Sequence, residues 1–389
     1  MSTARQILAV TGIGLRTIPQ RLGPSLVVVV GMACVVAVTV SILSLSTGFM
    51  RTMSSTGRPD RALVLSRNAQ YEGASTITRD NVPVIADAPG IRKAADGKAI
   101  VSADTMASVA VTKKSNGLDF FIDIRGIGPA GLALRPEITL INGRMFRPAT
   151  HELIVGKSAQ TAFEGLELGS KVQLPDGEWT VTGTFESGGN AFESGMLADA
   201  ETLLSGLRAN TFKSMTALLT DPGAFSRFKT ALTTNPTLQV DVLRETDYLA
   251  VQSRDLNRFL SVVAYLVGGV MGLGALFGAL NTLYSAVSTR STEIATLRVF
   301  GFGAGAILIS ILAEALLLSL VGAAIGALLA WLAFNGNLHA AGSLVFRLTV
   351  TPALAGEGIA FACVVGLLGG LFPALRAARV PVAVALRDS

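Results

Sequence analysis

Long apolar runs alternate with polar stretches along this chain. The apolar runs extend over about residues 24–47, 259–287, 304–334 and 354–375. A helix needs about 20 apolar residues to cross the hydrocarbon core of a bilayer, so each run is long enough to span a membrane. The pattern therefore predicts an α-helical membrane protein with four transmembrane helices.

A polar segment, residues 288–303, separates the second run from the third. Ile294, Leu297 and Phe300 recur about once per helical turn, while the charged residues fall elsewhere on the helical wheel. The Ser-Thr pair at the start of this segment and Gly301 near its end are typical helix boundaries. We expect a small amphipathic helix at one membrane face, and a simple hydrophilic hairpin is the alternative.

The stretch from residue 48 to about 257 has mixed polarity and predicts an α+β domain. Its strand-rich middle, about 105–190, is expected to form a subdomain inserted into an outer part that both ends of the stretch build. Pro175-Asp-Gly177 is a good hairpin turn between two of the predicted strands. The predicted strands are 62–65, 107–111, 120–124, 153–155, 171–174, 179–185, 215–219 and 238–242, and the predicted helices are 79–88, 157–163, 198–207 and 223–233.

A helical pattern returns at about Glu245, and no Gly or Pro interrupts it before Gly268. Since Gly and Pro are the usual helix breakers, the second spanning helix is expected to begin outside the bilayer and to enter it as one continuous rod.

The basic residues indicate the orientation of the chain, because cytoplasmic loops of membrane proteins are enriched in Lys and Arg. Arginines lie at the amino terminus, in the polar connector and in the carboxyl tail, whereas the short loop at 335–353 has Arg347 alone. Both termini and the connector are therefore expected in the cytoplasm, and the large domain outside. The arginines concerned are Arg5, Arg16, Arg21, Arg290, Arg298, Arg376, Arg379 and Arg387.

Composition agrees with a membrane protein. Apolar residues make up 50% of the 389 residues, Gly numbers 41, and the mean hydropathy is +0.54, whereas soluble domains are seldom this apolar. The net charge is +5, but the basic residues flank apolar runs, so we expect no nucleic-acid partner. Cys34 and Cys363 lie inside apolar runs, and His151 and His339 are far apart, so neither a disulfide nor a metal site is expected.

Two short motifs resemble nucleotide-binding loops but do not satisfy their requirements. Gly126–Gly131 has the spacing G-x-G-x-x-G, but Pro129 and Pro136 would disrupt the helix that receives a pyrophosphate, so we expect a strand-to-loop turn there. Gly156-Lys-Ser158 resembles the end of a P-loop, whose first glycine would fall on His151. The sequence contains none of the familiar hydrolase motifs, so we expect no enzyme activity and no cofactor in this chain.

The apolar runs contain two further features. Glycines four residues apart let helix backbones approach closely in lipid, so they predict a packed bundle or a subunit interface. Glu314 lies ten residues into the third run, where a carboxylate costs about 2.5–3.5 kcal/mol on insertion scales, so it should face protein or water. Both a functional role and a structural hydrogen bond stay open for Glu314. The glycine pairs are Gly268 with Gly272, Gly274 with Gly278, Gly322 with Gly326, and Gly366 with Gly370.

The amino-terminal segment has three arginines with apolar residues among them. A signal peptide is the alternative reading, but the apolar run that follows is too long for one, so we expect an uncleaved anchor. The expected order is an amphipathic helix on the cytoplasmic face (1–23), the first span (24–48), the external domain (49–256), the second span (257–287), the cytoplasmic connector (288–303), the third span (304–334), an external loop (335–353), the fourth span (354–376) and a cytoplasmic tail (377–389).

Several of these segments together resemble a known family. The segment Arg290–Gly301, followed by Glu314 and the pair of Gly322 and Gly326, is similar to the signature of MacB/FtsX/LolC-type ABC transporter permeases. The ending Pro373–Pro381 with Ala385-Leu-Arg387, and external stretches such as Asn142–Phe146 and Glu152–Gly156, also fit that family. The resemblance covers nearly the whole chain.

This resemblance implies an external domain with a porter-like part and an inserted β-rich subdomain. It also implies that residues 288–303 form a coupling helix on a cytoplasmic ABC ATPase, which binds the ATP and Mg and is present in two copies. By analogy, Arg290, Glu293 and Arg298 would make polar contacts, Ile294 and Leu297 would fill an apolar groove, and Gly301 would end the helix. ATP-driven closure would then move the external domain, a mechanism known as mechanotransmission.

The resemblance further implies a second permease copy, identical or paralogous, in the inner membrane of a bacterium, in contact with membrane lipid. Export with a periplasmic adaptor is the expected activity. A lipoprotein-releasing subunit and a regulator of a cell-wall hydrolase are the alternatives within the family. A membrane-anchored enzyme is the alternative outside it, and the missing catalytic motifs count against it.

Overall fold

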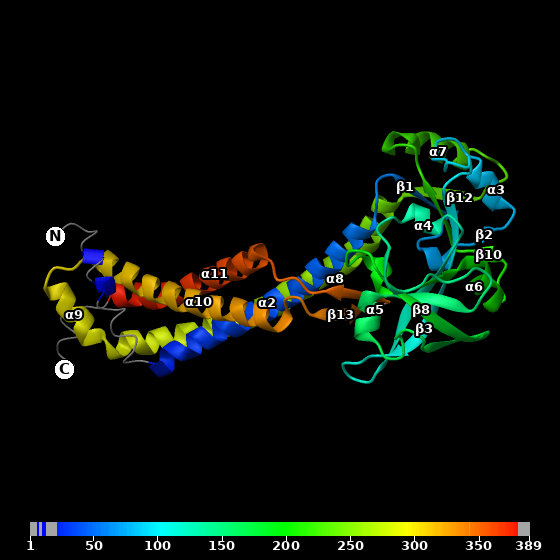
Figure 1. The fold of residues 1–389 in the computed structure, drawn as a ribbon. Coiled ribbons are helices and arrows are strands. Elements are labelled where there is room, and N and C mark those ends of the chain that lie inside the picture. The colour runs from blue at the N-terminus through cyan, green and yellow to red at the C-terminus, as the bar shows by residue number, and fades with distance from the viewer. Residues whose placement is uncertain (1–5, 8–9, 13–21, 342, 380–389) are drawn as a thin grey trace. The chain divides into compact units, whose positions relative to one another are not determined.

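The computed structural model describes residues 6–7, 10–12, 22–341 and 343–379. Most of the expected helix at 1–23 lies outside these described residues, as do Arg5, Arg16, Arg21, Arg387 and the rest of the tail from residue 380. The contacts within the chain divide it into two units, whose helices and strands are shown in Figure 1. The helical unit comprises the described residues within 1–47, 258–335 and 349–389, and the sheet unit comprises residues 48–257 and 336–348.

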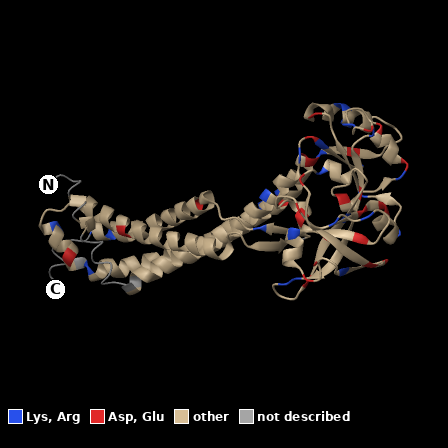
Figure 2. Cartoon of the chain, viewed as in Figure 1, with Lys and Arg blue, Asp and Glu red and all other residues tan. Residues whose placement is uncertain are grey.

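From residue 22 to residue 379, the described part of the helical unit contains four long helices and one short one. Each long helix has a stretch that is apolar and long enough to cross a membrane, as the sequence predicts. Charged side chains are sparse along these helices and more frequent on the sheet unit (Figure 2). The helices are α2 (Leu22–Thr56), α8 (Glu245–Thr289), α9 (Ser291–Val299), α10 (Ala304–Phe334) and α11 (Pro352–Ala378).

The helix α8 has 45 residues and begins at Glu245, where the sequence predicts its start. The helix α2 also continues past its apolar run, as far as Thr56. The additional turns of both helices belong to the sheet unit. Two helices of the chain therefore run without interruption from one unit into the other.

Glycines of α10 allow it to pack closely on α2. A Cβ atom at Gly322 would lie 2.5 Å from the carbonyl oxygen of Val29 in α2, and one at Gly326 would lie 2.4 Å from that of Ala33. Only glycine permits these backbones to approach so closely, which is the packing mode expected in lipid.

The glycine pair of α11 packs on α10 in the same way. A Cβ atom at Gly366 would lie 2.0 Å from the hydroxyl of Ser319, and one at Gly370 would lie 2.8 Å from Ala315 Cβ. Both glycines are buried. Both members of this pair therefore lie at a close contact between α11 and α10.

The two glycine pairs of α8 differ from each other. A Cβ atom at Gly268 would lie 2.6 Å from the hydroxyl of Thr39 in α2, and one at Gly272 would lie 3.0 Å from the ring of Phe361 in α11. Nothing lies within 4 Å of a Cβ atom at Gly274 or at Gly278. The first pair thus packs inside the bundle, although Gly272 meets the tip of a side chain and not a backbone. The second pair makes no such contact, because no helix of the described chain covers that side of α8, so for Gly274 and Gly278 the subunit interface is the alternative that stays a prediction.

The sheet unit is organised around one sheet of ten strands, in the order β12-β1-β11-β3-β4-β9-β6-β8-β5, with β7 paired to β8. The pairs β4–β9 and β6–β8 are parallel, and the other pairs are antiparallel. The strands are β1 (Arg61–Ser66), β3 (Val101–Thr112), β4 (Asp119–Ile127), β5 (Thr139–Gly143), β6 (Glu152–Gly156), β7 (Lys171–Leu174), β8 (Gly177–Glu186), β9 (Met196–Asp199), β11 (Ser214–Leu218) and β12 (Val240–Arg244).

Short helices and a two-stranded ribbon, β2 (Ile77–Thr78) with β10 (Thr211–Phe212), complete this unit. Helix α7 packs on β12, α6 on β3 and β4, and α5 on β8. Each of the eight strands predicted from the sequence overlaps an observed strand, and the β7–β8 turn forms at Pro175-Asp-Gly177. The helices are α3 (Asn81–Ala86), α4 (Gly131–Leu134), α5 (Lys157–Ala162), α6 (Ala200–Gly206) and α7 (Phe225–Thr233).

The sheet carries two separate apolar cores. One core includes Val64, Met215 and Phe228 and belongs to the outer part, and the other includes Ile124 and Trp179 and belongs to the middle part. The expected inserted subdomain therefore has a core of its own but no sheet of its own. The reason is that β3, with 12 residues, pairs with β11 at one end and with β4 along the other, so a single sheet serves both cores.

The segment expected as an external loop at 335–353 instead contains a β-hairpin, β13 (Leu338–Ala341) and β14 (Leu344–Arg347). Val345 is 2% exposed and belongs to the second core, and its carbonyl oxygen accepts a hydrogen bond of 2.7 Å from Ser194 Oγ. About 140 residues of sequence separate Val345 from the nearest other buried residue of this core, so the sequence could not show that Val345 belongs to it.

Candidate functional site

The first candidate site is the connector helix α9. The sequence predicts its start at residues 288–289, but α8 continues through Thr289, whose hydroxyl donates to the carbonyl oxygens of Ser285 and Ala286. Helix α9 therefore begins only at Ser291. Its end agrees with the sequence, because Gly301 has a φ of +87°, a conformation that favours glycine after the last turn of a helix.

The apolar side of α9 packs on its own unit. Ile294 is 7% exposed and lies in a cluster with Val287 of α8, Ile311 of α10 and Ala374 of α11. Leu297 is half-buried and lines a cavity of about 420 Å³ next to this cluster. In this conformation Ile294 is unavailable to a partner, in contrast to the role that the family resemblance implies for it.

The outer side of α9 consists of Thr292, Glu293, Thr296, Val299 and Phe300, all of which are exposed. Spacings of three and four residues place these side chains on one face of the helix. Val299 is 61% exposed and Phe300 is 77% exposed, so the end of α9 carries two adjacent exposed apolar side chains. The sequence alone did not single out Val299.

The two arginines of the connector make contacts inside the helical unit. Arg290 lies between two carboxylates, with Nε 3.3 Å from Glu293 Oε2 and Nη1 3.4 Å from Glu314 Oε2. Arg298 donates from Nη1 to the carbonyl oxygen of Ala378 at 3.1 Å, at the end of α11. Glu314, whose side chain is 11% exposed, is therefore paired with a cation, which lowers the cost of a carboxylate within an apolar helix.

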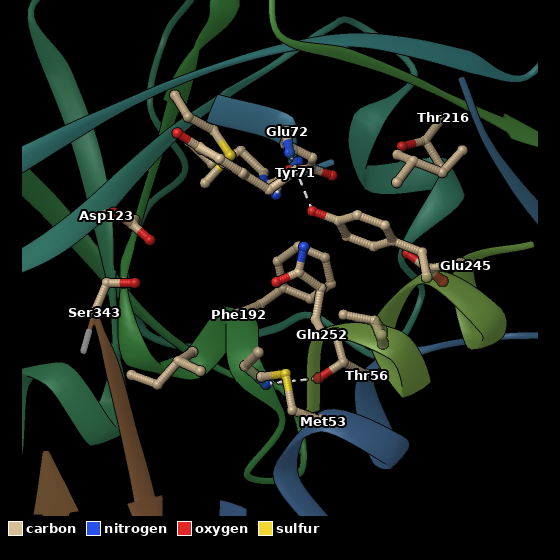
Figure 3. A pocket seen from close by; sticks show the side chains of 18 of the residues that line it. Met53, Thr56, Tyr71, Glu72, Asp123, Phe192, Thr216, Glu245, Gln252 and Ser343 are labelled. Carbon is tan, nitrogen blue, oxygen red and sulfur yellow. Dashed lines mark hydrogen bonds and ion pairs between the residues drawn. The ribbon is translucent and has the colours of Figure 1, made fainter. Parts of the chain in front are cut away.

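The second candidate site is a cavity of about 320 Å³ in the sheet unit, shown in Figure 3. Its walls come from the last turns of α2, the first turns of α8, strands β4 and β9, and the β13–β14 hairpin. Apolar side chains such as Met53, Leu63 and Phe192 form much of its surface. The sequence did not predict this cavity, because its walls come from segments that are up to about 300 residues apart.

Buried arginines and carboxylates form a network along one side of the cavity. Arg125 pairs with Glu72, and its Nη1 lies 3.1 Å from Asp104 Oδ2, while Arg135 Nη2 lies 2.6 Å from the same oxygen. Burial disfavours the charge on Arg125, but attraction by Glu72 and Asp104 outweighs that effect and raises the pKa of Arg125 above its ordinary value. Both arginines are held by the protein's own carboxylates.

A second network fixes the start of α8 within the sheet unit. Arg61 has a fully buried side chain, with Nη2 2.7 Å from Glu137 Oε2 and Nη1 3.3 Å from Glu245 Oε2. The same Glu245 oxygen accepts a hydrogen bond of 3.0 Å from the backbone nitrogen of Arg58. Removing one partner from such a buried ion pair leaves an uncompensated charge, so the pair anchors the first turn of α8 firmly.

The motifs that resemble nucleotide-binding loops have other roles in the structure. A Cβ atom at Gly126 would lie 2.7 Å from Ala200 Cα, and Gly131 begins the four-residue helix α4. Lys157 lies 3.1 Å from Glu186 in an exposed ion pair. Within the described part of the chain, no group of three His, Cys, Asp or Glu residues could hold a metal ion.

Two protein-family models match this chain. The MacB-like periplasmic core domain matches residues 25–255, and the FtsX-like permease C-terminal domain matches residues 265–382. Among curated proteins, the chain is 35% identical over 129 residues to the pyoverdine export ATP-binding/permease protein PvdT of Pseudomonas entomophila. It is 33% identical over 132 residues to the macrolide export ATP-binding/permease protein MacB of Shewanella oneidensis.

Each of these two alignments covers 33% of this chain and 18% of the relative, so only a small part of either relative is matched. A solved structure, the extracellular domain of the noncanonic ABC-type transporter YknZ from Gram-positive bacteria, aligns with a TM-score of 0.35 at 14% identity. That alignment covers 47% of this chain and 99% of the solved one.

Proposed function

Since the chain belongs to the MacB/FtsX-like family of ABC transporter permeases, we propose that it couples ATP hydrolysis by a separate cytoplasmic ATPase to movement of its extracytoplasmic domain. The observation that carries the proposal is α9, a short helix between two spanning helices with an exposed apolar end. The chain itself binds no ATP in this proposal, and ATP and Mg belong to the partner.

The docking surface on the ATPase is the outer face of α9. Val299 and Phe300 supply the apolar anchor, because exposed aromatic side chains near the centre of an interface contribute most of its binding energy. Glu293, with a side chain that is 63% exposed, supplies a polar contact beside them. Ile294, Leu297 and Arg298 then act from behind, by fixing α9 on its own unit.

Arg290 and Glu314 give the connector a second attachment. Their ion pair ties the beginning of α9 to α10, so a displacement of α9 would also move α10. In this proposal Glu314 positions the coupling helix through its contact with Arg290, so a structural contact serves the function.

The long helices transmit the movement. At a rise of 1.5 Å per residue, the 45 residues of α8 extend over about 70 Å, enough to cross the membrane and continue beyond it. The buried Arg61–Glu245 pair holds the outer end of this helix within the sheet unit. A shift of α8 at the connector would therefore reach the extracytoplasmic domain without any passage of substrate through the helices.

The assembly in this proposal contains two copies of the ATPase and two permease copies, identical or paralogous, in the bacterial inner membrane. Export with a periplasmic adaptor is favoured over lipoprotein release and over hydrolase regulation, because both curated relatives bear the names of export proteins.

The test replaces Phe300 with Asp. We expect the ATPase that co-purifies with the wild-type chain in mild detergent to be lost, together with stimulation of its ATP turnover, because a carboxylate cannot occupy an apolar groove. Phe121→Asp is the matched control, since Phe121 is 62% exposed on β4 of the sheet unit. If the Phe300→Asp chain still co-purified with the ATPase and still stimulated its ATP turnover, the docking role of α9 would be refuted.

A further inference from the structure

The connector helix α9 lies beside a cavity of about 420 Å³ in the helical unit. Its apolar walls come from three helices, with Leu283 and Val287 on α8, Ile307 and Ile311 on α10, and Leu297 on α9. Protein interiors are packed as densely as organic crystals, and voids larger than a water molecule are few. A space of this size next to the connector therefore suits an occupant from outside the described chain.

The cavity opens on the outer face of α9. Glu293, Thr296 and Phe300 line it as well, and all three are exposed. The same three residues belong to the face that docks on the ATPase in the proposed function. A partner that covers Phe300 would therefore also cover the opening of the cavity.

The charged groups in the cavity wall are paired within the chain. Arg290 and Glu314 both line the cavity, and Arg290 Nη1 lies 3.4 Å from Glu314 Oε2. A charged group that entered from outside would lose its hydration without a counter-ion to replace it, whereas an apolar group gains free energy by leaving water. The walls therefore favour an apolar occupant.

The rim distinguishes a protein partner from lipid. Glu293 and Thr296 place a carboxylate and a hydroxyl group at the opening, and the Glu293 side chain is 63% exposed. A charged side chain is costly next to the hydrocarbon of a bilayer. The opening is therefore better suited to the polar surface of a protein than to the acyl chains of lipid.

The volume is sufficient for a large side chain. A cavity of about 150 Å³ lined by Leu, Ile and Phe side chains accommodates a benzene ring. At about 420 Å³, the space beside α9 accommodates an aromatic or a long aliphatic side chain.

We propose that the ATPase inserts one large apolar side chain into this cavity, so that the contact at the connector is reciprocal. This inference rests on the proposed function. Phe300 enters the partner, and the partner's side chain enters the space between α8, α9 and α10. Because such a side chain would contact all three helices, a movement of the ATPase would reach both spanning helices directly and not through α9 alone.

The test fills the cavity from within. Ala286 of α8 is half-buried and lines the cavity, so the ring of the Ala286→Phe variant would occupy the space of the partner's side chain. Ser285→Phe is the matched control, because Ser285 is exposed on the same helix and lies outside the cavity lining. The full chain in lipid nanodiscs is titrated with the ATPase that co-purifies with it. We expect Ala286→Phe to weaken binding at least about tenfold, as loss of a central interface side chain does, and Ser285→Phe to leave the affinity unchanged.

Ser310 provides a second position for the same test, because it is buried on α10 and also lines the cavity. Ser310→Leu should weaken binding in the same way as Ala286→Phe. Thermal unfolding in detergent identifies a variant that fails to fold. Wild-type affinity in either filled variant, provided that it unfolds like the wild type, would overturn the inference.

A labelling experiment determines whether the cavity is open before the ATPase binds. In a chain whose Cys34 and Cys363 are replaced by Ala, we expect Ala286→Cys to react with a small methanethiosulfonate reagent and to be protected by bound ATPase. Protection without the ATPase would show that lipid or another segment of this chain fills the cavity. No protection with the ATPase would show that nothing enters it, and either result would overturn the inference.

The inserted side chain and the docking role can fail separately. If Phe300→Asp retains the ATPase, the docking role is refuted. If Phe300→Asp loses the ATPase while Ala286→Phe and Ser310→Leu bind it with wild-type affinity, docking through α9 stands and the inserted side chain is refuted.

Discussion

The ion pair between Glu152 and Arg144 shows how a single residue makes the stability of the sheet unit depend on pH. Two hydrogen bonds of 2.6 Å join these side chains, and Arg144 is the main reason why the pKa of Glu152 falls from 4.5 to about 2. Because the folded pKa lies below the unfolded value, the stabilisation is complete above about pH 4.5 and is lost as the pH falls toward 2.

As the pH falls through this acidic range, the free energy of unfolding of the Glu152→Gln variant should therefore decrease less than that of the wild type. Trp179 reports on it, since this residue is fully buried on β8, the strand that pairs with β6. Replacing Trp331 by Phe makes Trp179 the sole tryptophan. Denaturant titrations of both proteins at several values between pH 7 and pH 3 give the comparison. Parallel pH profiles would contradict the assigned role of the Arg144–Glu152 pair.

At the scale of elements, the sequence predicted the helices and strands whose pattern of apolar and polar residues lies within the element itself. Strand β8 alternates around Trp179, and α8 lacks helix breakers from Glu245 to Gly268, so both are readable from their own residues. The hairpin that contains Val345 and the short strand β9 depend on partners far along the chain, and no local pattern marks them.

The candidate sites follow the same division. The position of the connector between two apolar runs was readable, and so was its end at Gly301. The sequence did not show which side of α9 faces outward. Ile294 and Phe300 are both apolar, and the packing of the neighbouring helices decides which of them is buried. The cavity of the sheet unit was not readable at all, because it requires the fold of the whole sheet unit.

The contact between α2 and α10 gives a prediction at this scale. The Gly326→Ala variant places a methyl group 2.4 Å from the carbonyl oxygen of Ala33, so the helices must separate locally. We expect a loss of about 1–3 kcal/mol, the usual cost of overpacking, measured as a lower midpoint of thermal unfolding in detergent by helical circular dichroism. Gly305→Ala in the same helix is the control, because nothing lies within 4 Å of its added Cβ atom. Equal midpoints for the two variants would disprove the close packing.

At the scale of the whole molecule, α8 stands apart from the other long helices. In its most apolar stretch 17% of residues are buried within the chain, against 39–44% in α2, α10 and α11. Leu273, Gly274 and Phe277 lie on its exposed side. Gly268 and Gly272 of the same helix are buried against α2 and α11, so the open pair of Gly274 and Gly278 marks the side of α8 that the chain leaves uncovered.

A helix with so little internal packing and an open glycine pair is suited to contact a second permease copy, because small residues let two helices approach closely in lipid. In a chain whose Cys34 and Cys363 are replaced by Ala, we expect Gly274→Cys to form a disulfide-linked dimer in native membranes under mild oxidation. Leu329→Cys is the control, since Leu329 is 52% exposed on α10 and would face lipid in this arrangement. Cross-linking at residue 329 as efficient as at residue 274 would contradict the prediction that the exposed side of α8 contacts a second copy.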